Sequence, residues 1–364
     1  MTEIAVVGGG AVGLTATLEL ADSGAAVTLF EREEPGSGAT GRSAGICYDA
    51  YVDPRDAACA ARSLDRFREL GVLGERPYLW FARDGEAAGA IESHVDGMQA
   101  AGRDVSPLEP AAVNERFPAL ATADLTAAAV AENAGVVDTD RYVEAITARA
   151  RRAGVTIRTG TPATVRSPRR IEAGDDSLSV DAVLVAAGAW TNQVLDDVGV
   201  DLAVGTYRTQ LLQAALSGRG VGDGLPMVYD ASGEWYARPT TGGVLAGDGS
   251  AMYHGPPGAY GREADEPFRR ELLETLGERI DRTVEPTGSW AGLCTATPDG
   301  DPLVGECLPD LYVATGFCGH GFMRSPAVGE AVAEAMVGDG GVDAFDPTRF
   351  DGTEPIGLPG GVAE

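Results

Sequence analysis

Three glycines near the N-terminus have the spacing of a loop that binds the phosphates of a nucleotide. Gly8, Gly10 and Gly13 follow the pattern G-x-G-x-x-G, with Ala11 and Val12 between the last two. In such a loop the first glycine permits a tight turn, the second lets the backbone approach a pyrophosphate, and the third lets a helix pack closely on a strand. The N–H groups at the start of that helix face the phosphates. The pattern favours a dinucleotide site.

The residues around these glycines predict the strand, helix and strand that such a loop requires. Residues 4–7 form an apolar run typical of a buried parallel strand, a helical pattern continues to Gly24, and residues 26–30 form a second strand. Glu31 follows 18 residues after Gly13, near the spacing of about 20 at which an acid binds ribose hydroxyls. Its charge disfavours the 2′-phosphate of NADP. A plain βαβ unit with a glycine turn is the alternative.

A second glycine-rich loop follows and bears on which dinucleotide binds. Residues 36–45 read Gly-Ser-Gly-Ala-Thr-Gly-Arg-Ser-Ala-Gly, whereas a nicotinamide dehydrogenase usually continues here with another helix and strand. Backbone N–H groups and Arg42 of this loop could converge on the same pyrophosphate or on a flavin ring. The alternative is a flexible surface loop.

Later segments predict further approaches to the cofactor. Residues 180–185 and 311–315 read as buried strands, and the first ends in small residues around Gly188. The second leads through the glycine-rich turn 316–321 to a helix expected over 326–337. Between them, residues 204–255 alternate apolar and polar positions, which is typical of an antiparallel sheet.

Charge and composition limit the partners and the compartment. The 364 residues include 28 Lys+Arg, all of them arginine, against 55 Asp+Glu, which gives a net charge of −27. Such a surface repels nucleic acid and anionic lipid, and its self-repulsion is screened by concentrated salt. We interpret the chain as a halophile's cytoplasmic protein, with an ordinary acidic mesophile protein as the alternative.

Other features exclude several classes of protein. A hydrophobic content of 44% predicts a globular core. The first residues do not read as a signal peptide, and no run of about 18 apolar residues predicts a membrane span. The five cysteines include no C-x-x-C pair, so we expect neither a disulfide framework nor a metal site.

Five segments together resemble the D-amino-acid oxidase, sarcosine oxidase and glycine oxidase superfamily of FAD-dependent amine oxidoreductases. They are VVGGGAVGL with Glu31, GATGRSAG, VLVAAGAWT, TPDGDPLVG and YVATGFCGHGFMRSPAVGEAVAE, in this order over most of the chain. The resemblance implies an α/β fold (α+β overall), with a Rossmann-like FAD-binding domain and an interleaved antiparallel-sheet substrate domain. We assign residues 1–76, 134–203 and 286–364 to the FAD-binding domain, and residues 77–133 and 204–285 to the substrate-binding domain.

The resemblance also implies which residues contact FAD. The phosphate loop corresponds to Gly8, Gly10, Ala11, Val12 and Gly13, and the ribose region to Glu31 and Arg32. The loop along the pyrophosphate and flavin corresponds to Thr40, Arg42, Ser43, Ala44 and Gly45, and the backbone contact to adenine corresponds to Val165. The remaining contacts correspond to Ala187, Gly188, Trp190, Gly316, Gly319, His320, Gly321, Phe322 and Met323.

The implied reaction is oxidation of a C–N bond by hydride transfer to flavin N5, which gives an imine that hydrolyses. The substrate would be a small amine or amino acid, such as a D-amino acid, glycine or an N-methyl amino acid. A substrate carboxylate needs an arginine fork, for which we name Arg238, Arg324 and Arg208. We expect Tyr236 to line the pocket and His320 to lie on the flavin side.

Two departures from the superfamily refine these expectations. Sarcosine-type oxidases use a lysine near the flavin to help oxygen react, but this chain has none, and Met323 stands where their last segment has a lysine. We therefore favour a dehydrogenase with an unidentified electron acceptor, unless an arginine substitutes. Gly292 stands at the position of the cysteine that attaches flavin covalently in that group, so we expect noncovalent FAD.

Two other functions remain open on sequence grounds. The same fold carries flavin-dependent dehydrogenases of 2-hydroxyacids and of glycerol phosphate, and the fold does not choose between C–OH and C–N bonds. The chain could also be a non-catalytic subunit that holds FAD within a larger complex.

Overall fold

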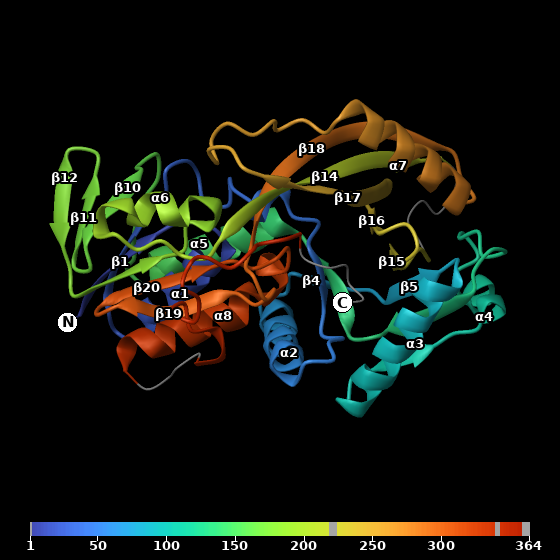
Figure 1. Ribbon diagram of the computed structural model, residues 1–364, viewed down its shortest axis with the longest axis horizontal. Helices are drawn as coiled ribbons and strands as arrows, with labels where there is room; N and C mark the ends of the chain where they lie inside the picture. The colour runs from blue at the N-terminus through green and yellow to red at the C-terminus, as the bar shows by residue number, and fades with distance from the viewer. Residues whose placement is uncertain (1, 218–223, 339–342, 359–364) are drawn as a thin grey trace.

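Two large sheets organise the chain, one toward each end of its long axis (Figure 1). The computed structural model describes residues 2–217, 224–338 and 343–358. The predicted domains also include residues 1, 218–223, 339–342 and 359–364, which lie outside the described residues. The architecture confirms the α/β class, α+β overall, because one sheet is mainly parallel and the other mainly antiparallel.

The first sheet has six strands, and all but one of its neighbouring pairs are parallel. Its order is β19 (Leu303–Leu308), β20 (Leu311–Thr315), β13 (Ala182–Val185), β1 (Glu3–Val7), β2 (Ala26–Phe30) and β9 (Thr156–Arg158), with only β19 antiparallel to its neighbour. Val7 lies opposite both Phe30 and Val185. The strands that precede Gly8, Glu31 and Ala186 therefore end at the same edge, where nucleotides bind in parallel sheets.

Alternate residues of β1 pack into two different cores, as expected for a parallel strand buried on both faces. Ile4 and Val6 pack with the helices α1 (Ala11–Asp22), α5 (Thr139–Arg152) and α8 (Gly321–Val337). Ala5 and Val7 pack with the three-stranded antiparallel sheet β10 (Ala163–Ser167), β11 (Arg170–Ala173) and β12 (Asp176–Ser179). The apolar run at residues 4–7 thus forms the predicted strand.

The second sheet has eight strands and is antiparallel except between β15 and β5. Its order is β18 (Val284–Ala296), β14 (Gly205–Leu216), β17 (Gly243–Tyr253), β16 (Trp235–Thr240), β15 (Met227–Asp230), β5 (Tyr78–Ala82), β7 (Ala127–Ala131) and β6 (Val105–Pro107). The predicted domain boundary at residue 286 falls inside β18, whose pairing with β14 continues to Ala296.

The remaining elements connect and cover these sheets. A small sheet consists of β3 (Ile46–Tyr48), β8 (Ala134–Val137) and β4 (Leu73–Glu75). The other helices are α2 (Pro54–Glu69), α3 (Gly85–Ala100), α4 (Pro110–Arg116), α6 (Thr191–Leu195) and α7 (Glu266–Arg279). Within the described part of the chain, no helix is long and apolar enough to cross a bilayer.

The last helix begins five residues earlier than predicted, at Gly321 rather than Pro326. A proline inside a helix cannot donate to the carbonyl one turn before it, so the sequence favoured a start at the proline. In the structure the Ser325 hydroxyl donates to the Phe322 carbonyl at 2.8 Å. This bond satisfies the carbonyl that Pro326 leaves without a backbone donor, and the helix continues through the proline.

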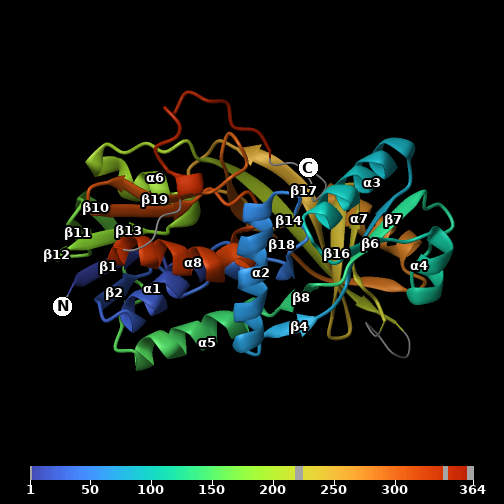
Figure 2. The same ribbon diagram turned by 90° about the horizontal axis from the view of Figure 1, so that it is seen from below.

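Helices α1 and α8 lie side by side under the first sheet (Figure 2). A Cβ atom added at Gly329 of α8 would stand 2.5 Å from Cβ of Thr15 and 2.9 Å from the Ala16 nitrogen. The absence of a side chain at Gly329 therefore sets how closely the two helices approach.

We expect Gly329→Ala to lower the free energy of unfolding by about 1–3 kcal/mol, the usual cost of overpacking a filled core. Gly277→Ala on α7 is the matched control, because a Cβ there meets nothing within 4 Å. It should raise stability by about 0.5–1 kcal/mol through helix propensity. Chemical denaturation measures both, and equal effects would contradict the close contact.

Candidate functional site

A cavity of about 1080 Å³ lies between the two sheets. Gly8, Glu31 and Ala186 line it from the end of the parallel sheet, and Tyr207 and Tyr236 line it from the antiparallel sheet. Its volume matches the upper range of ligand pockets, roughly 300–1,000 Å³. The cavity is therefore large enough for a dinucleotide together with a small substrate.

The first glycine turn fits a phosphate-binding loop. Gly8 has φ +115°, and an added Cβ would stand 2.3 Å from the Ala186 carbonyl oxygen. A Cβ at Gly13 would stand 2.1 Å from the Gly8 oxygen, so Gly13 serves packing and does not line the cavity. No side chain caps α1 at Gly10. The start of α1 therefore offers N–H groups and a partial positive charge to an anion.

Glu31 holds the turn in place through both carboxylate oxygens. Its Oε2 accepts from the Gly9 N–H at 2.8 Å, and its Oε1 accepts from the Glu33 N–H at 2.9 Å. Each oxygen keeps acceptor capacity for a ribose hydroxyl, because a carboxylate has about four lone-pair sites.

The loop 36–45 closes over the same helix end. Thr40 Oγ1 accepts from the Ala11 N–H at 3.0 Å. Arg42 Nη1 donates to the carbonyls of Ser37 and Gly38 in its own loop. Gly45 does not line the cavity, because its α-carbon packs against the Val137 carbonyl. The loop is thus tied to α1 rather than free on the surface.

The end of the cavity near Glu31 offers flat surfaces. The Arg32 guanidinium lies 3.5 Å from the centre of a Trp190 ring, and both residues line the cavity. The side chain of Val165, whose backbone we expect to contact adenine, is fully buried in the adjacent core. Ala163 and Thr164 of the same strand line the cavity.

The late glycine turn also lines the cavity. Gly319, His320 and Gly321 lie there with Phe322 and Met323 at the start of α8, where no side chain caps the helix. Gly316 is absent from the lining because a Cβ there would stand 2.4 Å from Cγ2 of Thr297. The two glycine turns, more than 300 residues apart in the sequence, thus border one cavity.

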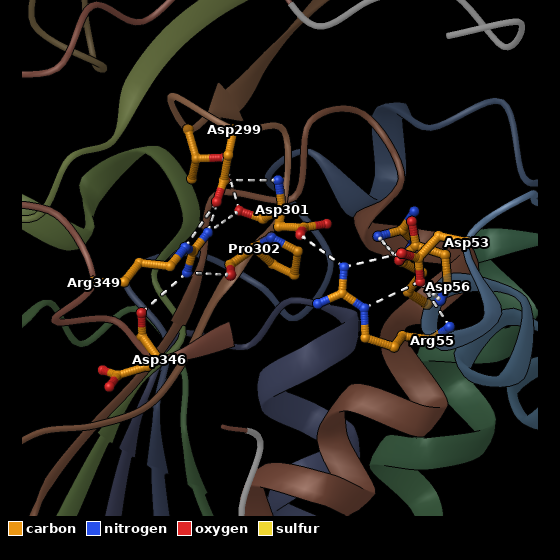
Figure 3. A network of polar contacts seen from close by, with 10 residues as sticks. Asp53, Arg55, Asp56, Asp299, Asp301, Pro302, Asp346 and Arg349 are labelled. Atoms are coloured by element: carbon orange, nitrogen blue, oxygen red, sulfur yellow. Dashed lines mark hydrogen bonds and ion pairs between the residues drawn. The ribbon is translucent and has the colours of Figure 1, made fainter. Parts of the chain in front are cut away.

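A network of ion pairs holds the turn 297–302, which packs against the late glycine turn (Figure 3). Arg349 donates to both carboxylate oxygens of Asp299 at 2.9 Å. Arg55, at the start of α2, pairs with Asp53 at 3.0 Å and lies 3.7 Å from Asp301. The network joins three segments that are distant in the sequence.

His320 is held in its neutral form. Burial lowers the pKa of His320 to about 3, and the nearby Arg324 charge acts in the same direction. Arg324 is itself buried, forms an ion pair with Asp56 at 2.9 Å, and lies 4.9 Å from the Tyr51 ring centre. The Tyr51 hydroxyl in turn donates to Met323 Sδ at 2.9 Å.

None of the three arginines named for a substrate carboxylate lines the cavity. Arg324 lies behind His320 and pairs with Asp56. Arg208 pairs with Asp265 at 3.0 Å, and Arg238 donates to the Ala44 carbonyl. The sequence did not predict these partners, because the alternation of a strand shows only the face from which a side chain starts. It does not show where the end of a long side chain lies.

The structure brings most of the other predicted residues together. Those that line the cavity are Gly8, Gly10, Ala11, Val12, Glu31, Arg32, Thr40, Arg42, Ser43, Ala44, Ala187, Gly188, Trp190, Tyr236, Gly319, His320, Gly321, Phe322 and Met323. Sequence reasoning missed four tyrosines in the lining, namely Tyr48, Tyr78, Tyr207 and Tyr229. They stand on four different strands, and no local spacing relates them.

Comparison with known proteins agrees with this geometry. A family model described as FAD dependent oxidoreductase (DAO) matches residues 3–335. Glycine oxidase of Pseudomonas aeruginosa is 27% identical over 92% of this chain and 94% of its own length, and monomeric sarcosine oxidase of Arthrobacter is 25% identical over 92% of each. The solved L-proline dehydrogenase of P. horikoshii has a TM-score of 0.86 at 26% identity, covering 97% of this chain and 98% of that one.

We expect Gly8→Ala to raise the dissociation constant for FAD by about tenfold to a hundredfold, since a strained backbone costs about 1–3 kcal/mol. The control is Gly24→Ala, which also has positive φ but meets nothing within 4 Å. Flavin fluorescence titration measures both. An equal loss of FAD affinity in both variants would mean that the contact between Gly8 and Ala186 is unimportant.

The neutral His320 predicts a pH effect on stability. Its pKa in the folded chain lies below the ordinary value of 6.5, so the unfolded chain alone binds a proton between pH 6.5 and 3. The folding stability that the neutral His320 contributes is fully present above pH 6.5. Below pH 6.5 it decreases by up to about 1.4 kcal/mol for each pH unit. Denaturation of His320→Asn should show a shallower loss than the parent, with His94→Asn as the control. A parallel loss in His320→Asn would argue against a neutral His320.

Proposed function

The chain belongs to the DAO family of FAD-dependent oxidoreductases, and from this we propose that it oxidises an amino acid or a secondary amine as a dehydrogenase. Its relatives include enzymes that act on amines and amino acids. When bound, FAD supplies the hydride acceptor at N5 of its ring. The alternatives that oxidise a C–OH bond, or only hold FAD, have no comparable support.

One observation carries the proposal: the early and the late glycine turns border the same cavity. Each turn leads into a helix whose N-cap residue makes no side-chain cap, and in α1 the Ala11 N–H donates to the side chain of Thr40. We assign the α1 end to the phosphates and the α8 end to the flavin. Glu31 then binds the ribose through the lone pairs that its backbone contacts leave free.

The residues beyond the glycine turns exclude water and orient the substrate. Tyr48, Tyr78 and Tyr207 are buried side chains in the cavity wall. Removing water strengthens every electrostatic interaction inside a site. His320 stays uncharged in the same cavity, so it positions the substrate without repelling a positive charge on it.

The charges near the cavity favour a dehydrogenase over an oxidase. A fixed cation beside the flavin would stabilise developing superoxide, but the chain has no lysine. Arg42 lines the cavity, yet its Nη1 already donates to two carbonyls of its own loop. We infer that electrons leave to an acceptor other than oxygen.

We propose that FAD is held without a covalent bond. Gly292 lies beside Arg42, with an added Cβ 3.5 Å from the Arg42 Cβ, and it offers no sulfur for attachment. Cys294 lines the cavity, but burial raises the pKa of its thiol to about 11. A protonated thiol is a poor nucleophile.

We expect an amine or amino acid to bleach the bound flavin in the absence of oxygen. Glycine, sarcosine, D-alanine, L-proline and pyrrolidine would be tested in molar salt against lactate and glycerol 3-phosphate, with absorbance as the readout. Bleaching by a hydroxyl compound alone would overturn the proposal. Bleaching by none of them, while dithionite still reduces the flavin, would favour the role of an FAD-holding subunit.

The same reduced protein tests the electron acceptor. Because the chain has no lysine and Nη1 of Arg42 already donates to two carbonyls, we expect reoxidation by an artificial dye to exceed reoxidation by air at least about tenfold. Stopped-flow absorbance and a peroxide assay measure the two rates. Rapid release of peroxide in air would show an oxidase.

A further inference from the structure

We propose that the substrate is a cationic amine without a carboxylate group, an inference that rests on the amine oxidation proposed above. The wall of the cavity formed by the eight-stranded sheet presents aromatic rings and an acid. It offers no guanidinium group to an anion among its described lining residues.

The aromatic wall follows from strand pairing. Tyr229 of β15 lies directly opposite Tyr236 of β16. Tyr236 reaches over Gly247 of the next strand, where an added Cβ would stand 2.3 Å from its hydroxyl oxygen. On the neighbouring β3, the Tyr48 ring centre lies 5.2 Å from that of Tyr78 on β5. All four rings line the cavity.

These rings are polar at their edges but carry no charge. Burial raises the pKa of Tyr48 and of Tyr78 well above the ordinary value. Neutral hydroxyls donate weaker hydrogen bonds to a carboxylate than guanidinium groups do. The ring faces attract cations, because their quadrupoles place negative charge there.

The charged arginines that line the cavity already have partners within the protein. The described lining residues include two arginines, Arg32 and Arg42. Arg32 stacks on Trp190 next to Glu31, at the adenosine end of the cavity. Arg42 donates to carbonyls of its own loop, and His320 is neutral. A carboxylate brought against the tyrosines would therefore lose its water and meet neutral hydroxyls, because Arg32 and Arg42 already have partners of their own.

One acid lies among the same lining residues. Glu234 is exposed, lines the cavity and has φ 52°, in the turn that joins β15 to β16. Buried Asp230 fixes this turn by accepting from the backbone N–H groups of Ser232 and Gly233 and from the Trp235 indole.

The chemistry of such a substrate balances without a carboxylate. The ammonium first gives one proton to water, and its α-carbon then gives a hydride to the oxidised cofactor. The resulting iminium adds one water molecule and separates into an aldehyde and a protonated amine. A neutral His320 does not repel the entering cation.

Binding of two unreactive probes tests the preference apart from turnover. Benzyltrimethylammonium and benzoate have similar size and opposite charge, and each would be titrated into the FAD-loaded protein in molar KCl with flavin absorbance as the readout. We expect the ammonium probe to bind at least about tenfold more tightly, equal to about 1.4 kcal/mol. Equal or tighter binding of benzoate would overturn the proposal.

Matched substrates extend the test to the reaction. Pyrrolidine would be compared with proline, and dimethylamine with sarcosine, by the rate of anaerobic bleaching. We expect the partner without a carboxylate to react faster in each pair. Faster bleaching by the amino acids would overturn this inference and leave the proposed function standing. No bleaching by either class would overturn the proposed function itself.

A variant that removes one negative charge tests whether Glu234 contributes to binding of the ammonium probe. Glu234→Gln should weaken binding of benzyltrimethylammonium by about threefold to tenfold and leave benzoate binding unchanged or stronger. Glu274→Gln, on the exposed side of α7, removes the same charge away from the cavity and should change neither. Equal effects of the two variants would contradict a role for Glu234.

Discussion

The close contact between α1 and α8 is the constraint on which the site depends. Gly329 lets α8 approach Thr15 of α1 to a distance that no larger residue would allow. Both helices begin at a glycine turn, and both turns line one cavity. The N-cap residues of the two helices form no side-chain cap, so backbone donors of both helices, apart from the Ala11 N–H that donates to Thr40, face the same space. The packing of two helices therefore creates the electrostatics of the site.

The arginines of this chain mainly hold segments together. Arg349 and Arg55 hold the turn that supports the late glycine turn (Figure 3). Arg324 pairs with Asp56 behind His320, and Arg208 pairs with Asp265. None of these four arginines lines the cavity.

The chemical character of the cavity changes along its length. The end near the parallel sheet offers glycine turns, helix N-termini and Glu31, which suit phosphates and a ribose. The end formed by the antiparallel sheet offers tyrosine rings and Glu234, and the neutral His320 of the late glycine turn lines the same cavity. One end thus suits an anionic nucleotide and the other suits a cation, which keeps the two ligands from competing.

The sequence alone determined the elements whose signals are local. The glycine spacing at Gly8 to Gly13, the acid at Glu31 and the apolar runs at residues 4–7 and 311–315 predicted the nucleotide-binding strands and turns, because backbone conformation and strand burial depend on near neighbours. The start of α8 was placed less well, since the Ser325 hydrogen bond overrides local preference.

Only the tertiary structure decided which side chains meet in the cavity. The tyrosine wall comes from strands that are distant in the sequence, and their rings meet through sheet pairing and packing rather than through sequence spacing. The three arginines named for a carboxylate carried the right chemistry, but the direction of a long side chain depends on the partners around it. Asp56, Asp265 and the Ala44 carbonyl bind those arginines outside the cavity, and no sequence spacing reveals such partners.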